Sequence, residues 1–292
     1  MNNRFTGIWP ALVTPFHDGG EAVDHRALRG LVQRFADAGV AGIVACATTG
    51  EAGTLSQDER LSVLDSVLKA APSLPLVAGL SGINPRSMLA ELEAIRQRPV
   101  AGILVPPPSY VRPSQTAIVR FYEDVAAPGV PVIIYNIPYR TGVRIERDTF
   151  RELARIPGLV AVKDCGGDTA LTQELIAESR FDVLTGEDLQ IFTTLCLGGA
   201  GAITASAHVR PDLFVKMAHA LAAGDLGTAR RIQAALRPMI ESLFAEPSPA
   251  PLKAALAAMG LIGDAVRLPL LSVSPVLRDM LDRQVRGLNA LA

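Results

Sequence analysis

Eight short apolar runs recur along the first three quarters of the chain. Each run is rich in Val, Ile, Leu and Ala and is nearly continuous, with little alternation of apolar and polar positions. Such a run is typical of a strand that is buried on both faces, as in a parallel sheet. The predicted strands are residues 8–14, 42–47, 74–80, 102–105, 130–135, 159–163, 181–184 and 201–205.

Stretches with a helical period of apolar residues separate these runs. Two of the stretches begin with clear start signals. Ser56 and Ser114 each place a capping hydroxyl before a helix, and Glu59 adds the acidic residue of a capping box at the first. The predicted helices are residues 25–38, 57–71, 85–97, 114–126, 146–156, 168–179, 187–197 and 211–222.

The alternation of strands and helices predicts an α/β fold, a (β/α)₈ TIM barrel. A doubly wound open sheet is the alternative, but no G-x-G-x-x-G motif follows the first run. Beyond residue 222 the pattern is purely helical, with helices predicted at 224–244, 250–260 and 274–291. We therefore expect a barrel at residues 1–223 and a C-terminal three-helix extension at residues 224–292. The extension needs an apolar surface, either the flank of the barrel or a second subunit.

Composition and charge narrow the possible partners. The chain is 49% hydrophobic with a net charge of −1 and has no basic run, which argues against nucleic acid. No segment approaches the roughly 18 apolar residues of a membrane span, and the N-terminus lacks a signal-peptide pattern, so we expect no membrane partner and a cytoplasmic location. Three scattered cysteines and four histidines without ligand spacing predict neither a disulfide framework nor a metal site.

Lys163 is the last residue of the sixth predicted strand, so a positively charged side chain follows an apolar run that should be buried. Lysine is almost never fully buried unless it is paired or functional. A desolvated lysine becomes nucleophilic and can form a Schiff base with a ketone or aldehyde. The alternative is a strand-terminal side chain that reaches solvent.

The other strand ends carry side chains that suit this chemistry, because a barrel of this type presents its catalytic groups there. A hydroxyl relay carries protons during imine formation, and cationic or amide donors hold carboxylates. The candidates beside Lys163 are Thr48, Thr49, Tyr110, Tyr135, Arg140 and Gly186.

Each candidate also has a purely structural interpretation. Thr48 and Thr49 precede Gly50, where they either cradle an anion with the turn amides or only shape the turn. Tyr135 either transfers protons or caps the barrel rim. Arg140 either binds a carboxylate of a ligand or forms an ion pair with Glu51 or Asp164. Three further residues are expected to have structural roles: Cys165 as a buried filler, and Glu187 and Asp188 as the start of the next helix.

With these residues in place, the chain resembles the dihydrodipicolinate synthase/N-acetylneuraminate lyase family of class I, pyruvate-utilising barrel enzymes. The resemblance extends from Ala11-Leu-Val-Thr-Pro-Phe16 to Glu246-Pro-Ser-Pro-Ala-Pro-Leu-Lys253. Between them, Thr48-Thr-Gly-Glu51, Tyr135-Asn-Ile-Pro138 and Lys163 occur in the order and spacing of the family.

The resemblance implies a role for each candidate. Lys163 would form the Schiff base with pyruvate, and Tyr135 would transfer protons. Thr48 would link Tyr135 to Tyr110, which would reach the site from a neighbouring subunit. The resemblance further implies that no cofactor is needed and that the chain assembles as a homotetramer, a dimer of dimers.

The remaining roles concern substrate binding. Thr49 would help to hold the pyruvate carboxylate, Ile203 would line the floor through its backbone, and Gly186 is a further binding residue. Arg140 matches the synthase branch, where it binds the carboxylate of L-aspartate 4-semialdehyde. The resemblance therefore implies condensation of pyruvate with this aldehyde to 4-hydroxy-tetrahydrodipicolinate, a step of lysine and diaminopimelate biosynthesis.

Several departures from the family pattern leave the second substrate open. Ala47, Ala52 and Ser109 replace the usual residues at their positions, and Tyr139 stands where known synthases carry a small residue. The alternatives are another class I aldolase or dehydratase acting on a 2-keto-3-deoxy sugar acid or a hydroxyproline-pathway substrate, and a non-catalytic barrel.

Feedback by lysine is expected to be weak or absent. The positions that carry imidazole and amide groups in lysine-inhibited members hold Gln57, Arg60 and Ile83 here.

Overall fold

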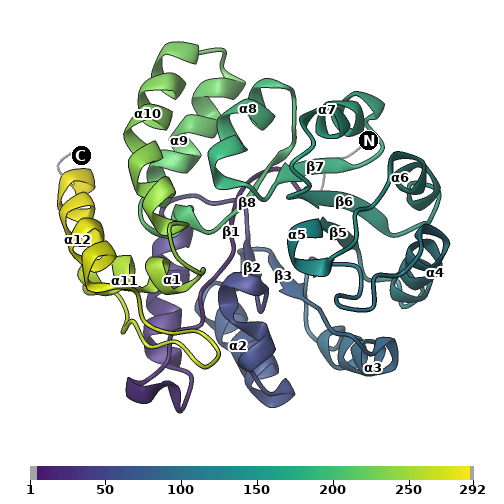
Figure 1. Ribbon diagram of the computed structural model, residues 1–292, viewed down its shortest axis with the longest axis horizontal. Coiled ribbons are helices and arrows are strands. Elements are labelled where there is room, and N and C mark those ends of the chain that lie inside the picture. The colour runs from purple at the N-terminus through teal and green to yellow at the C-terminus, as the bar shows by residue number, and fades with distance from the viewer. Residues whose placement is uncertain (1–4, 290–292) are drawn as a thin grey trace.

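The computed structural model describes residues 5–289 and contains eight parallel strands, with helices between them (Figure 1). The strands are ordered β1-β8-β7-β6-β5-β4-β3-β2. A parallel bridge between Ala11 and Val44 joins the two ends of this order, and the Leu12 N–H donates to the Val44 carbonyl at 2.8 Å. The sheet therefore curls into the predicted (β/α)₈ barrel.

All eight predicted strands are confirmed, and the first three are each three residues shorter than their apolar runs. Nearly every strand residue is buried, because the barrel interior covers one face and the helices cover the other. The strands are β1 Gly7–Pro10, β2 Ile43–Ala45, β3 Leu76–Gly79, β4 Gly102–Val105, β5 Val132–Asn136, β6 Leu159–Asp164, β7 Asp182–Thr185 and β8 Gly201–Thr204.

The helices of the barrel also follow the predicted pattern. The capping box at Ser56 and Glu59 is present, and the Ser114 hydroxyl accepts from the Ala117 N–H at 3.3 Å. The helices are α1 His25–Asp37, α2 Gln57–Ala70, α3 Pro85–Ile95, α4 Gln115–Ala126, α6 Arg147–Leu153, α7 Thr169–Glu178, α8 Ile191–Cys196 and α9 Pro211–Ala222.

Two helical segments differ from the prediction. The helix expected at 187–197 is divided into a 3₁₀ turn, η4 Asp188–Gln190, and α8. An additional helix, α5 Pro138–Thr141, follows β5 and ends at Gly142 in a left-handed conformation. Four residues are too few to show a helical period, so the apolar pattern could not reveal α5.

The C-terminal extension packs on the flank of its own barrel. It contains α10 Leu226–Leu243, α11 Ala250–Ala258 and α12 Pro275–Asn289, so part of the third predicted helix, residues 290–291, lies outside the described residues. α10 packs against α9, and α12 packs against α10 and α11 (Figure 1). Apolar residues of the extension belong to the same hydrophobic core cluster as residues of β2 to β7.

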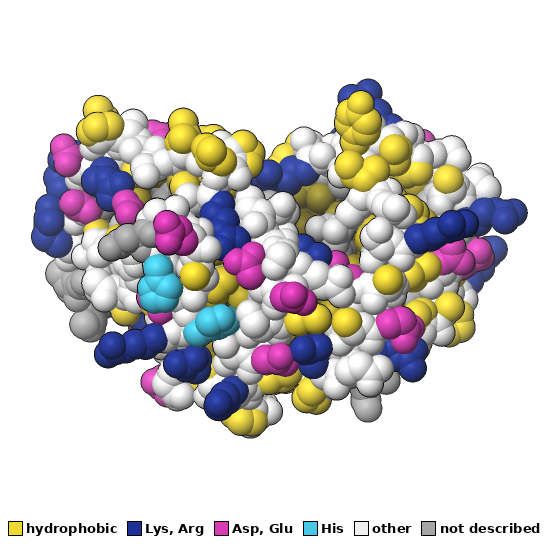
Figure 2. Space-filling view, turned by 90° about the horizontal axis from the view of Figure 1, so that it is seen from below, with side chains coloured by type: hydrophobic (Ala, Val, Ile, Leu, Met, Phe, Trp, Pro, Cys, Tyr) yellow, Lys and Arg dark blue, Asp and Glu magenta, His cyan; other side chains and the backbone are white. Residues whose placement is uncertain are grey.

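The face of the molecule shown in Figure 2 carries charged side chains of both signs. Acidic and basic side chains are interspersed over the face in Figure 2, which is hollowed by a notch along its upper edge. None of the described helices combines the length and the hydropathy needed to cross a bilayer.

Candidate active site

A cavity of about 400 Å³ opens at the carboxyl ends of the strands. Its walls come from the ends of β2, β5, β6, β7 and β8, from α5 and from the segment that joins α10 to α11. The lining residues are Thr48, Thr49, Tyr135, Tyr139, Arg140, Lys163, Gly186, Asp188, Ile203, Ala205 and residues 244–248. The structure thus brings together seven of the eight predicted site residues, and Tyr110 is the exception.

Lys163 is buried in this cavity, with 5% of its surface exposed. It lies directly beside Tyr135 in the register of β6 and β5, and its Nζ atom is 4.2 Å from the centroid of the Tyr135 ring. Burial lowers the pKa of Lys163, against the opposing effect of its acidic neighbours, Asp188 among them. The alternative of a solvent-reaching lysine is therefore wrong, and the amine is placed to act as a nucleophile.

Gly186 leaves room for the Lys163 side chain. A Cβ atom at residue 186 would lie 2.4 Å from Cε of Lys163 and 2.4 Å from the Cys165 thiol, closer than van der Waals contact permits. A larger residue at this position would therefore displace the lysine. The Cys165 thiol is itself buried, and burial raises its pKa, which agrees with its assignment as a filler.

A buried hydrogen-bond network fixes the ends of β5 and β6. The Asn136 amide donates to Asp164 Oδ1 at 2.8 Å, and the Gly166 N–H donates to the same oxygen at 2.9 Å. The Thr172 hydroxyl donates to Asp164 Oδ2 at 2.5 Å. Because Asn136 and Asp164 directly follow Tyr135 and Lys163, this network holds the two reactive side chains in register.

Tyr135 is buried, and its phenol interacts with Thr48. Burial raises the pKa of Tyr135 well above its usual value, while a hydrogen bond with Thr48 acts in the opposite direction. The tyrosine is therefore neutral at physiological pH and able to donate a proton. The interpretation of Tyr135 as a capping residue of the rim does not account for its position beside Lys163.

Thr48 and Thr49 belong to a 3₁₀ turn, η2 Thr48–Gly50, that follows β2. The Thr14 hydroxyl, from the end of the first predicted strand, donates to the Gly50 carbonyl at 2.7 Å and holds the turn. Both threonines line the cavity, which is where the predicted anion-binding role would require them to be.

Arg140 and Tyr139 stand side by side on α5 at the rim of the cavity. The Arg140 guanidinium carbon lies 5.8 Å from the centroid of the Tyr139 ring. No carboxylate among residues 5–289 forms an ion pair with Arg140. The two acidic groups proposed as its partners are engaged elsewhere, Glu51 with Lys253 and Asp164 in the network described above. Arg140 is therefore available to a carboxylate of a ligand.

The sequence interpretation missed two parts of the cavity. Asp188 begins η4 but does not cap it; instead its carboxylate accepts from the Ser206 N–H at 2.6 Å and faces the cavity. Its place beside Gly186 at the end of a strand was the available signal. Residues 244–248 line the cavity from the extension, and no local pattern in the sequence indicated this contact.

Tyr110 does not line the cavity of its own chain. It lies in the loop after β4, 84% exposed, with a positive φ of 71° that is uncommon for a bulky residue. Beside the cavity, a hollow of about 180 Å³ is lined by Thr48 and Tyr135 and also by Ser109, the neighbour of Tyr110.

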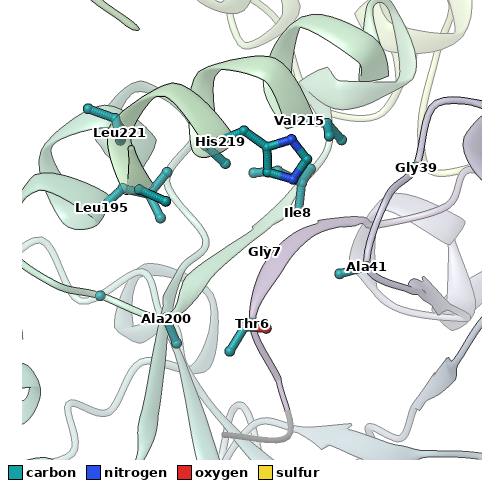
Figure 3. A pocket seen from close by; sticks show the side chains of 13 residues that line it. Thr6, Gly7, Ile8, Gly39, Ala41, Leu195, Ala200, Val215, His219 and Leu221 are labelled. Atoms are coloured by element: carbon teal, nitrogen blue, oxygen red, sulfur yellow. The ribbon is translucent and has the colours of Figure 1, made fainter. Parts of the chain in front are cut away.

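A larger cavity of about 460 Å³ lies at the opposite, amino-terminal end of the strands (Figure 3). It is bounded by the start of β1 at Thr6 and Gly7, by Ala200 before β8, and by α9. His219 is the single titratable side chain among its described lining residues. This end of a barrel contributes mainly to stability, so we place the chemistry at the carboxyl end.

The barrel and its buried, strand-ending lysine define a class I lyase. The chain belongs to the dihydrodipicolinate synthetase family, whose model matches residues 4–287. It is 37% identical to 4-hydroxy-tetrahydrodipicolinate synthase 2 of Clostridium acetobutylicum over 96% of this chain and 99% of that protein. It is 38% identical to the 4-hydroxy-tetrahydrodipicolinate synthase of Neisseria gonorrhoeae over 92% of this chain and 93% of that protein.

Solved structures give the same result. The Thermotoga maritima dihydrodipicolinate synthase superposes with a TM-score of 0.94 at 29% identity, covering 99% of this chain and 100% of that one. The Acinetobacter baumannii enzyme, in a complex with pyruvate, has a TM-score of 0.93 at 32% identity, covering 97% and 99%. The Cyanidioschyzon merolae enzyme, with lysine bound, has a TM-score of 0.93 at 27% identity and full coverage of both chains.

Proposed function

We propose that this protein condenses pyruvate with L-aspartate 4-semialdehyde to give 4-hydroxy-tetrahydrodipicolinate. The observation that carries the proposal is the placement of the Lys163 amine, buried beside the Tyr135 ring, in a cavity whose rim holds the unpaired Arg140. The names of the relatives from Clostridium acetobutylicum and Neisseria gonorrhoeae support the same reaction.

The first half of the reaction uses the buried lysine. The neutral Lys163 amine attacks the ketone carbon of pyruvate, which is favoured because burial lowers the pKa of this lysine. Tyr135 supplies the proton that lets the carbinolamine lose water, and Thr48 relays protons to and from Tyr135. Thr49 and the amides of its turn hold the pyruvate carboxylate, with the backbone of Ile203 as the floor.

The second half uses the rim of the cavity. Loss of a methyl proton from the imine gives an enamine, whose carbon attacks the aldehyde carbon of the semialdehyde. Arg140 holds the carboxylate of this substrate bidentately. The substrate amine then attacks the imine carbon, which closes the ring and releases Lys163 as the free amine.

We further propose a homotetramer built as a dimer of dimers, in which Tyr110 serves the site of a neighbouring subunit. The support is the exposure of Tyr110 and the hollow beside Thr48 and Ser109, which a two-fold partner could fill. A cytoplasmic location is part of the proposal, and the free thiols of Cys46, Cys165 and Cys196 agree with a reducing compartment.

One observation favours a second candidate function. Tyr139 occupies the rim beside Arg140 and restricts the space for the second substrate. The same enamine could then attack a different aldehyde, or the site could process a 2-keto-3-deoxy sugar acid or a hydroxyproline-pathway compound. A non-catalytic barrel is disfavoured by the assembly of Lys163, Tyr135 and Thr48 in one cavity.

Borohydride reduction in the presence of pyruvate tests the first step. We expect a mass increase of one reduced pyruvate on Lys163 in the wild-type protein and in Lys69→Ala, which removes an exposed lysine of α2, but none in Lys163→Ala. A coupled assay with the semialdehyde then tests the second substrate. If pyruvate is trapped on Lys163 but the semialdehyde is not converted, the second substrate is another aldehyde. If no pyruvate is trapped, the proposed function is rejected.

A further inference from the structure

Two buried charges outside the cavity are not used by the proposed reaction. Glu51 directly follows the η2 turn, and Lys253 lies in α11 of the extension. The side chains of both residues are completely inaccessible to solvent, and Lys253 Nζ contacts Glu51 Oε1 in an ion pair. A fully buried ion pair carries a large desolvation cost, and loss of one partner leaves an unpaired buried charge.

The pair joins the extension to the turn that carries Thr48 and Thr49. Glu51 adopts a left-handed conformation with φ 53°, between η2 and a second 3₁₀ turn, η3 Ala52–Thr54. This backbone conformation is uncommon for a residue other than glycine, so surrounding contacts must hold it. The Glu51 N–H donates to the Thr48 carbonyl at 3.1 Å. The residue whose side chain is held by Lys253 is therefore bonded through its backbone to the η2 turn.

Arg267, a second residue of the extension, also binds Glu51 and the segment that follows it. The Arg267 N–H donates to Glu51 Oε2 at 3.0 Å, and its guanidinium donates to the Thr54 carbonyl at 3.0 Å and to Glu59 Oε1 at 2.6 Å. Lys253 Nζ donates to the Ala265 carbonyl at 2.8 Å. The extension therefore holds the segment from Glu51 to Glu59, which directly follows the turn.

The ring of Phe16 packs against both cations, Lys253 and Arg267. Lys253 Nζ lies 4.0 Å from the ring centroid, and the Arg267 guanidinium carbon lies 4.4 Å from it. A cation over an aromatic face is attracted by the ring quadrupole, and this contact excludes water from the pair. Neither Glu51 nor Lys253 lines the cavity, so neither can touch a substrate bound there.

We propose that the Glu51–Lys253 ion pair is a positioning device for the keto-acid site, a proposal that rests on the function given above. It fixes the turn so that Thr49 meets the carboxylate of the keto acid and the Thr48 hydroxyl reaches Tyr135. The extension thus contributes to the site in two ways, by lining the cavity with residues 244–248 and by holding the turn that carries Thr48 and Thr49.

A double variant separates positioning from folding. Lys253→Met alone leaves the Glu51 carboxylate buried without its cation. We expect this variant to have a lower melting temperature than the wild-type protein. Glu51→Gln with Lys253→Met removes both charges, keeps an acceptor for the Arg267 N–H, and should recover most of the lost stability. We expect this double variant to show a KM for pyruvate raised on the order of tenfold and slowed borohydride trapping.

The matched control removes another ion pair of the extension. Arg237→Met with Glu241→Gln breaks an exposed ion pair within α10 that does not involve Glu51, Lys253 or Arg267. This control should trap pyruvate at the wild-type rate. Hydrogen exchange should show faster exchange at residues 48–54 in the Glu51/Lys253 double variant and wild-type exchange there in the control.

The outcomes distinguish the two proposals. A stable double variant with wild-type trapping, wild-type KM for pyruvate and unchanged exchange at residues 48–54 would overturn the positioning role. A wild-type protein that fails to trap pyruvate would overturn the proposed function, while faster exchange in the double variant would still show that the pair holds the turn.

Discussion

The reactivity of Lys163 depends on neighbours that are small or correctly placed. Its amine is desolvated by the barrel interior, which lowers its pKa, and its chain lies across Gly186, where any Cβ would collide with it. Tyr135 lies beside it on the adjacent strand. Single residues at three strand ends therefore place the proposed nucleophile, Lys163, next to the proposed proton donor, Tyr135.

Tyr139 is the residue most expected to set the choice of aldehyde. Its ring narrows the rim beside Arg140, so Tyr139→Ala should raise the rate with bulkier aldehydes relative to the semialdehyde by about tenfold. Tyr139→Phe keeps the ring and serves as the control. Competition assays with paired aldehydes measure the preference, and an unchanged preference in Tyr139→Ala would contradict this role.

His208 predicts a pH dependence of stability that is independent of catalysis. Its ring is fully buried, its Nε2 accepts from the Val13 N–H at 3.1 Å, and its Nδ1 lies 2.8 Å from the Ala205 carbonyl. Burial lowers the pKa of His208 from 6.5 to about 4. Between these values the unfolded state binds a proton that the folded state does not, so stability falls as pH decreases through this window.

The His208 contribution corresponds to about 3 kcal/mol between pH 6.5 and 4. Urea unfolding at several pH values measures it, and His208→Gln should show a flatter dependence than the wild-type protein. Carboxyl groups titrate in the same range, so the difference between the two proteins is the informative quantity. Parallel pH curves for the two proteins would contradict this assignment.

At the level of elements, polar contacts between the strand ends, and between the extension and one of the turns, position the side chains of the site. The Asn136–Asp164 hydrogen bond joins β5 to β6 immediately beyond the reactive pair. The turn after β2 is held from outside the barrel by Glu51 and Lys253. Precision at the site therefore comes from contacts between elements, because a loop alone would not hold these side chains.

The packing of α2 against α3 supports the expectation that inhibition by lysine is weak or absent. Arg60 of α2 pairs bidentately with Glu91 of α3, with Nε–Oε1 and Nη2–Oε2 distances of 2.5 and 2.8 Å. Because the guanidinium and the carboxylate are bound to each other, neither is free to bind the carboxylate or the ammonium group of a lysine ligand. Activity and melting temperature measured with millimolar lysine should both remain unchanged. Strong inhibition by lysine would refute this prediction.

At the level of the whole molecule, the barrel by itself does not complete the proposed site. The extension supplies one wall of the cavity and anchors another. Tyr110 is exposed and does not line the cavity of its own chain. The proposed relay from Tyr135 through Thr48 therefore needs a second subunit to supply its last hydroxyl.

Mixing two inactive variants tests this sharing of subunits. A hybrid of Lys163→Ala and Tyr110→Ala contains one site with both residues intact if Tyr110 acts across the two-fold interface. Random reassembly after mixing should then restore about a quarter of the wild-type activity. The separate variants, treated identically, serve as controls. No recovery in the mixture, with hybrids verified by mass spectrometry, would place Tyr110 outside the partner site.

The sequence by itself determined the order and kind of the barrel elements, because apolar runs and helical periods are local properties of the chain. It also determined the candidate residues at the strand ends, since each directly follows a run. Only the tertiary structure decided the contacts between residues that are far apart in the sequence. It placed residues 244–248 across the cavity, turned Asp188 toward the cavity, and paired Glu51 with Lys253, about 200 positions away in sequence. Burial, which makes Lys163 a nucleophile, is likewise a property of the folded chain alone.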